Sequence, residues 1–125
     1  LNMAREGKYH NYAIRGMNPG VLSRYFKSDG NYHQLDTEIM SMVHFEKLNL
    51  KDVFAARRFG TFDMIMCRNV MIYFDDEMKQ KVVKMYHNQL ADDGTLYIGH
   101  SETLRNLDVA FAQLDVPQAF AYRKA

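Results

Sequence analysis

The chain has 125 residues and a formal net charge of +1, and 47% of its residues are hydrophobic and 25% charged, as in one ordinary globular domain. This charge balance gives no basic bias toward a nucleic-acid backbone, and no apolar stretch approaches the roughly 18 residues of a membrane span. A single cysteine, Cys67, excludes an internal disulfide, and the five histidines lack metal-ligand spacing. We therefore expect a cytoplasmic protein without a metal site, a nucleic-acid partner or a membrane-inserted segment.

The first third of the chain is rich in turn residues. Residues 1–6 predict a helix that ends at a glycine, and residues 7–20 predict irregular structure. A short helix is expected over residues 21–26. The Ser-Asp-Gly-Asn sequence at 28–31 is the strongest turn signal, and residues 43–48 alternate as a strand does.

The sequence is organised around residues 62–74, which read FDMIMCRNVMIYF. The apolar run at 64–67 shows no alternation, which is typical of a parallel strand buried on both faces. Arg68 and Asn69 follow at its carboxyl end, where ligands bind in open α/β sheets. A guanidinium and a carboxamide there offer several donors and an acceptor for a polar ligand. Alternatively, the two residues only end the strand and satisfy a turn.

A helix and a second strand are predicted next. Asp75 and Asp76 supply an N-cap and an acidic first turn, which explains this carboxylate pair without catalysis. Apolar residues at helical spacing continue to Leu90, and the Asp-Asp-Gly sequence at 92–94 predicts the end of the helix. Residues 95–99 predict a buried strand that runs parallel to the first one.

The segment Gly-His-Ser-Glu-Thr at 99–103 follows the second strand, on the same edge as Arg68 and Asn69. It differs from the G-x-S-x-G nucleophile elbow because Thr103 replaces the last glycine. We expect Ser101 to cap a short helix through Leu107. Residues 111–116 and 119–123, separated by Pro117, predict a closing pair of antiparallel strands.

Two segments, FDMIMCRNVMIYFDDEMKQKVV and LADDGTLYIGHSETL, resemble the carboxyl-terminal half of the CheR-type chemotaxis methyltransferases. The similarity is densest at CRNVMIYF and GHSE. It implies an α/β fold, namely part of the Rossmann-like sheet of class I S-adenosylmethionine-dependent methyltransferases, with parallel strands and a closing antiparallel pair. Residues 1–125 would form the carboxyl-terminal fragment of one methyltransferase domain, with a small β subdomain inserted at about 20–48. The family's glycine-rich first cofactor loop has no counterpart in this sequence.

The resemblance also implies an activity, the methylation of glutamate side chains on the cytoplasmic domains of chemoreceptors, with S-adenosylmethionine as donor and S-adenosylhomocysteine as product. Asn49, Leu50, Arg68 and Asn69 match cofactor-contacting positions of the family. Tyr73 matches a tyrosine near the transferred methyl, where an aromatic face suits a sulfonium cation. From the residues alone, Asn49 would instead form a turn with its own backbone and Tyr73 would be a core aromatic.

Two hypotheses about function remain open at this point. The chain is part of a methyltransferase, or it is a non-catalytic signalling module that keeps the same fold. The presence of Asn49, Arg68, Asn69 and Tyr73 together favours the methyltransferase. Without the rest of the sheet, the central strand would have an open edge, and such edges pair with other chains. We therefore expect self-association.

Overall fold

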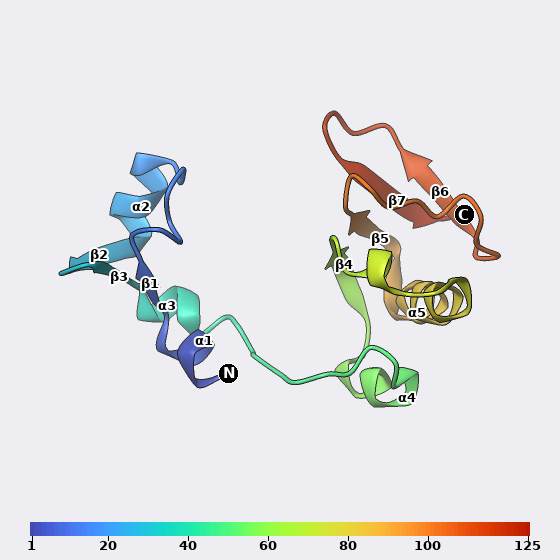
Figure 1. Cartoon of the computed structure of the whole chain (residues 1–125), viewed down its shortest axis with the longest axis horizontal. Helices are drawn as coiled ribbons and strands as arrows, with labels where there is room; N and C mark the ends of the chain where they lie inside the picture. Colours follow the sequence, from blue (N-terminus) through green and yellow to red (C-terminus); the bar gives the residue numbers. More distant parts are fainter. The chain divides into compact units, whose positions relative to one another are not determined.

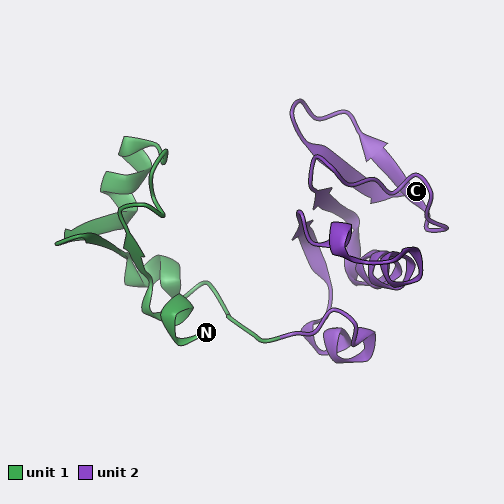
Figure 2. Ribbon diagram, in the orientation of Figure 1, with its two compact units in different colours: residues 1–47 green, residues 48–125 purple.

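The computed structural model describes all residues, 1–125, and they form two compact units. Figure 2 shows Leu1–Lys47 as one unit and Leu48–Ala125 as the other. Each unit contains its own β-sheet. The residues predicted to contact a cofactor all belong to the second unit.

The first unit is built on a small antiparallel sheet with the strand order β1-β3-β2 (Figure 1). The turn between β2 and β3 contains Gly30 with φ 60°, a left-handed conformation that favours glycine. The helices and strands are α1 Asn2–Glu6, β1 Lys8–His10, α2 Pro19–Tyr25, β2 Phe26–Asp29, β3 Tyr32–Leu35 and α3 Thr37–Met40.

Three predictions for this unit are confirmed: α1, which ends at the left-handed Gly7, the short helix α2, and the turn after residue 28. Two are wrong. Residues 7–20 are not all irregular, because β1 pairs with β3. Residues 43–48 alternate but form no strand, since they connect the two units and pair with no other strand. The boundaries of the inserted subdomain stay a prediction.

The second unit contains a four-stranded mixed sheet with the order β4-β5-β7-β6. β4 and β5 run parallel, and the other neighbours are antiparallel. The expected α/β class, with a parallel pair and a closing antiparallel pair, is therefore confirmed. The elements are α4 Val53–Ala56, η1 Arg57–Phe59, β4 Phe62–Cys67, η2 Met71–Tyr73, α5 Asp76–Gln89, β5 Leu90–Ile98, β6 Phe111–Leu114 and β7 Phe120–Lys124.

Helix α5 connects the two parallel strands and packs its apolar face into the core. The Asp75 carboxylate caps it by accepting a hydrogen bond from the Met78 N–H at 2.8 Å, as the sequence predicts. Val82 and Val83 are fully buried, and each such side chain contributes roughly 1.5–3 kcal/mol. They belong to the same cluster as Leu96 in β5, so the helix is held against the sheet.

The end of α5 differs from the prediction. The helix stops at Gln89, and the Asp-Asp-Gly sequence that follows lies within β5. Leu90 already has extended backbone, pairs with Phe62 and is 1% exposed, so its burial in the core ends the helix early. Gly94 has no left-handed conformation but makes room for this leucine, since a Cβ there would lie 2.7 Å from the Leu90 Cδ1.

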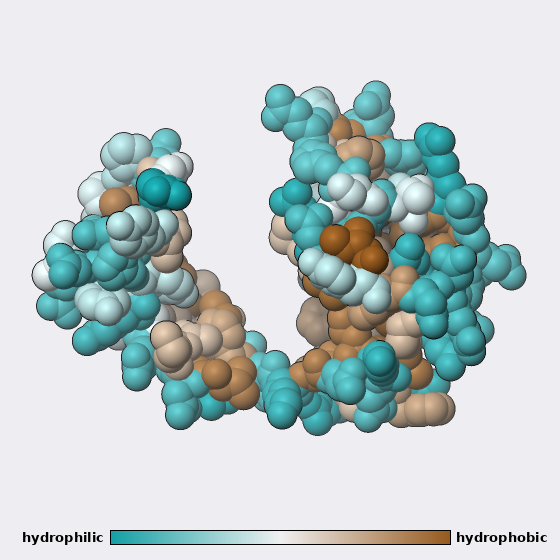
Figure 3. All heavy atoms as spheres, viewed as in Figure 1, coloured by the Kyte–Doolittle hydropathy of each residue, from teal (hydrophilic) through white to brown (hydrophobic).

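Strand β4 lies at one edge of the sheet, and one of its faces is open. Met64 and Met66 are 55% and 63% exposed, so the prediction of a strand buried on both faces is wrong for this chain. Figure 3 shows hydrophobic atoms gathered around this part of the second unit, whereas the surface over α5 is largely hydrophilic. No element of the chain covers the alternating residues Phe62, Met64 and Met66, although a central strand of an α/β sheet has neighbours on both sides.

An unpaired strand edge beside exposed methionines is expected to make the chain self-associate. Sedimentation velocity at increasing concentration should show dimers or larger species, and Met66→Lys should shift them toward monomer because a charge on this face opposes pairing. Met42→Lys is the matched control, since Met42 is 73% exposed in the other unit. A clean monomer at high concentration would contradict the prediction.

Candidate functional site

The candidate site lies where β4 and β5 end. Because these strands are parallel and pair Cys67 with Ile98, the residues that follow each strand meet at one edge of the sheet. Arg68 and Asn69 leave β4 there, and Gly99 begins the segment after β5. The predicted meeting of the CRN and GHSE segments is therefore confirmed.

Glu102 joins the two segments. Its side chain is buried, with 8% exposed, and its carboxylate accepts four backbone hydrogen bonds. Oε2 accepts from the N–H groups of Gly99 at 2.7 Å and Asn69 at 3.2 Å. Oε1 accepts from those of Val70 at 3.1 Å and Met71 at 2.9 Å. Since a carboxylate has about four lone-pair sites, it is saturated, and it fixes the loop after β4 to the end of β5.

The prediction that Ser101 caps a short helix in this segment is wrong, and the structural role belongs to Glu102. Residues 100–108 contain turns and no helix, so Ser101 caps nothing. The GHSE segment is predicted from the sequence to lie at this edge, but the prediction assigns no role to its glutamate. The available signal was an acidic residue four positions after the end of β5, opposite a loop whose N–H groups needed acceptors.

Asn69 adopts an unusual backbone conformation, with φ 61°. The position facing it must be a glycine: a Cβ on Gly99 would overlap the Asn69 Oδ1 and lie 3.0 Å from its backbone nitrogen. The side chains of Arg68 and Asn69 are exposed and make no hydrogen bond or ion pair within residues 1–125. Strand-end capping is therefore done by Glu102, which leaves the guanidinium and the carboxamide available to a ligand.

Arg68 lines a pocket of about 290 Å³ at this edge of the sheet. His100 and Gln118 line the same pocket, and the His100 ring contacts Phe120 edge-to-face at 5.3 Å. The volume approaches the lower end of the 300–1,000 Å³ range of small-molecule sites. The pocket is thus a polar recess beside the rim.

Tyr73 belongs to η2 and is 82% exposed, which excludes the alternative of a core aromatic in this chain. It lines a second pocket, of about 280 Å³, together with Lys51. Arg68 and Tyr73 thus line two different pockets, and both residues lie in the segment between β4 and α5 that Glu102 holds in place.

Asn49 and Leu50 precede that lysine. The Asn49 Oδ1 accepts a hydrogen bond from the Lys51 N–H at 3.0 Å, so the turn that the residues alone suggested is present. Leu50 is half-buried against the core that contains β4 and α5. Lys51 and Tyr73 line the same pocket, so Asn49 and Leu50 lie near η2 in the structure. That Asn49 and Leu50 contact a cofactor stays a prediction.

Cys67 has a packing role. It is 5% exposed, and burial raises the pKa of its thiol, which a hydrogen bond with Tyr86 partly offsets. Burial, and secondarily the same hydrogen bond, also raises the pKa of the Tyr86 phenol far above its usual value. Both groups therefore keep their protons near neutral pH, and Cys67 is not an activated nucleophile.

Comparison with known proteins gives consistent matches. The family profile described as "CheR methyltransferase, SAM binding domain" matches residues 1–120. The chain is 38% identical to "Chemotaxis protein methyltransferase 1" of Pseudomonas aeruginosa over 98% of its own length and 45% of the relative's. It is 36% identical to "Chemotaxis protein methyltransferase" of Escherichia coli, over 89% of the chain and 40% of that relative. The chain thus spans less than half the length of these relatives. None of the helices combines the length and the apolar composition that a membrane-spanning helix needs.

Proposed function

The chain belongs to the CheR methyltransferase SAM-binding domain family, and on that premise we propose that it forms part of an S-adenosylmethionine-dependent enzyme that methylates glutamate side chains of chemoreceptors in the cytoplasm. The observation that supports this most is the rim between β4 and β5. Glu102 fixes the loop that carries Asn69, and the neighbouring Arg68 and Tyr73 side chains are exposed and have no packing role.

The residues of the rim fit the cofactor chemically. S-adenosylmethionine carries carboxylate and hydroxyl oxygens, which suit the five donors of Arg68 and the carboxamide of Asn69. Its sulfonium is a cation, which the exposed ring of Tyr73 can stabilise. Asn49 and Leu50 are proposed to complete the set of cofactor-contacting residues. The side chains of Arg68, Asn69 and Tyr73 have no hydrogen bond or ion pair that binding would break, whereas Asn49 accepts the turn bond from Lys51 and Leu50 packs partly against the core.

The cofactor supplies a methyl group on a positively charged sulfur, and its transfer to a glutamate oxygen forms an ester and leaves a neutral thioether. A glutamate is already ionised at neutral pH, so no residue of the chain has to act as a general base. What the rim residues contribute is alignment and the exclusion of water. A loop held to one buried carboxylate by three hydrogen bonds, and through a fourth to Gly99 after β5, is suited to that task because it keeps its shape before the reactants arrive.

The proposal is tested by methyl transfer in a chimera, in which the amino-terminal portion of the Pseudomonas aeruginosa relative precedes this chain. The chimera is incubated with S-adenosylmethionine labelled in the methyl group and a chemoreceptor cytoplasmic domain. Label should enter the receptor and be released as methanol in alkali, as expected of a carboxyl ester. A receptor with glutamine at the modified positions is the control and should stay unlabelled. Alkali-stable label would contradict esterification, and cofactor binding without any transfer would favour the non-catalytic signalling module.

A further inference from the structure

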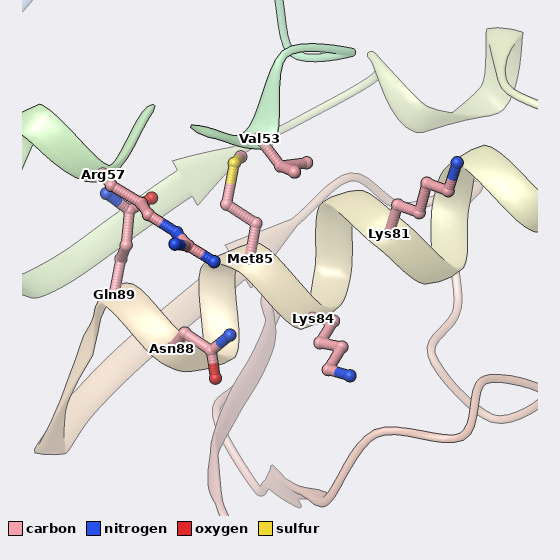
Figure 4. Close-up of a pocket in the computed structure, with 7 residues that line it drawn as sticks. All are labelled: Val53, Arg57, Lys81, Lys84, Met85, Asn88 and Gln89. Carbon is pink, nitrogen blue, oxygen red and sulfur yellow. The ribbon is translucent and has the colours of Figure 1, made fainter. Parts of the chain in front are cut away.

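A pocket unrelated to the rim lies between η1 and α5 (Figure 4). Its volume is about 180 Å³, well below the 300–1,000 Å³ of small-molecule sites, so it holds a side chain rather than a cofactor. Val53 and Met85 give it an apolar wall, and Met85 is 6% exposed. The cavity is thus suited to one apolar side chain of a larger partner.

The charges around this pocket have one sign. Arg57, Lys81 and Lys84 line it, and no acidic side chain does. Lys81 pairs with Glu77 on its own helix at 3.7 Å, but both groups are mostly exposed, so this bond is weak. Arg57 and Lys84 have no ion pair in the chain. The whole chain has a net charge of only +1, so this concentration of positive charge is local.

Hydrogen bonds within the chain tie together the two segments that form the pocket. The Gln89 amide, at the end of α5, donates to the carbonyl of Ala56 and to that of Gly60 at 3.3 Å, which ties α5 to the segment around η1. The Arg57 guanidinium lies 4.7 Å from the centre of the Phe54 ring and extends toward α5 (Figure 4). A preformed site spends less ordering entropy when a partner docks.

We propose that this pocket is a docking site for an acidic segment of a partner protein, which inserts one apolar side chain between Val53 and Met85 and places carboxylates against Arg57 and Lys84. The apolar wall and the small volume favour a peptide over a free phosphate. A nucleic-acid backbone is disfavoured because it carries no apolar side chain that would fill the space between Val53 and Met85. The proposal concerns protein recognition and does not depend on the methyl-transfer proposal.

The test uses this chain and a fluorescein-labelled peptide that has glutamates on both sides of one leucine, with binding followed by fluorescence anisotropy. Lys84→Glu should weaken binding about tenfold or more, because the reversed charge repels the carboxylates. Arg123→Glu is the matched control: it makes the same charge change at an exposed position of β7, and should alter the affinity less than about twofold. Far-ultraviolet circular dichroism checks that both variants fold.

Two altered peptides make the assignment specific. A peptide with glutamines in place of the glutamates should bind about tenfold more weakly, and one with glycine in place of the leucine should also lose affinity. Equal binding of the glutamine peptide, an equal loss in Arg123→Glu, or the absence of binding at about 1 mM peptide would overturn the proposal. Displacement of the labelled peptide by a short polythymidine strand at equal concentration would assign the pocket to nucleic acid instead.

Discussion

Replacement of Glu102 with alanine is expected to lower the free energy of unfolding of this chain by roughly 2–4 kcal/mol, because it leaves backbone N–H groups without an acceptor in a partly buried loop. Four such groups depend on this one carboxylate: those of Asn69, Val70, Met71 and Gly99. Urea denaturation followed by circular dichroism measures the loss. Glutamine should recover only part of the stability, since its amide presents a donor to two of the four N–H groups.

Glu77→Ala is the matched control for the Glu102 variant. Glu77 has a mostly exposed side chain and pairs only with Lys81, so its removal should cost less than about 0.5 kcal/mol. If Glu102→Ala and Glu77→Ala are equally stable, the carboxylate does not hold the two segments together. A large loss for Glu102→Gln as well as Glu102→Ala would support the requirement for both carboxylate oxygens.

Gly99→Ala is expected to displace Asn69 and to reduce cofactor affinity at least about tenfold in the chimera, which corresponds to a loss of about 1.4 kcal/mol. The added methyl would overlap the Asn69 carboxamide and crowd its backbone nitrogen. We also expect overpacking to lower stability by roughly 1–3 kcal/mol. Urea denaturation gives the stability, and calorimetric titration with S-adenosylhomocysteine gives the affinity.

Gly30→Ala distinguishes this clash from a general cost of replacing glycine. Gly30 has φ 60° and open space where a Cβ would stand, so alanine costs about 1–2 kcal/mol of backbone strain without touching a neighbour. It lies in the other unit, and its variant should bind cofactor normally. A Gly99→Ala variant that keeps full affinity would show that Asn69 need not occupy its present position.

The sequence predicts the parallel pair, α5 and the closing hairpin because each depends on local patterns: an apolar run, a helical periodicity capped by Asp75, and a break at Pro117. The end of α5 could not be predicted this way. The local signal at residues 92–94 places the end of the helix there, but the helix already ends at Gln89, because Leu90 is buried in the core as the first residue of β5. The exposure of Met64 and Met66 could not be predicted either, because it depends on the neighbours of β4 in the sheet and not on the local sequence pattern.

The candidate site was predictable only in part. Arg68 and Asn69 follow a strand directly, so their place at the carboxyl edge follows from the topology of a parallel pair. Three of the four hydrogen bonds of Glu102 could not be read from the sequence, because they join residues more than 30 positions apart and depend on the left-handed turn at Asn69. Long-range satisfaction of backbone groups leaves no periodic pattern in a sequence.

Calorimetric titration of S-adenosylhomocysteine into this chain and into the chimera tests the proposed cofactor site most directly. We expect binding to the chimera, loss of that binding in its Arg68→Ala variant, and no binding to this chain alone, because the chain spans only 45% of its Pseudomonas aeruginosa relative and the cofactor site is proposed to need residues of the remainder. Absence of binding to both proteins, or unchanged binding to the Arg68→Ala chimera, would contradict the assignment of the rim as a cofactor site.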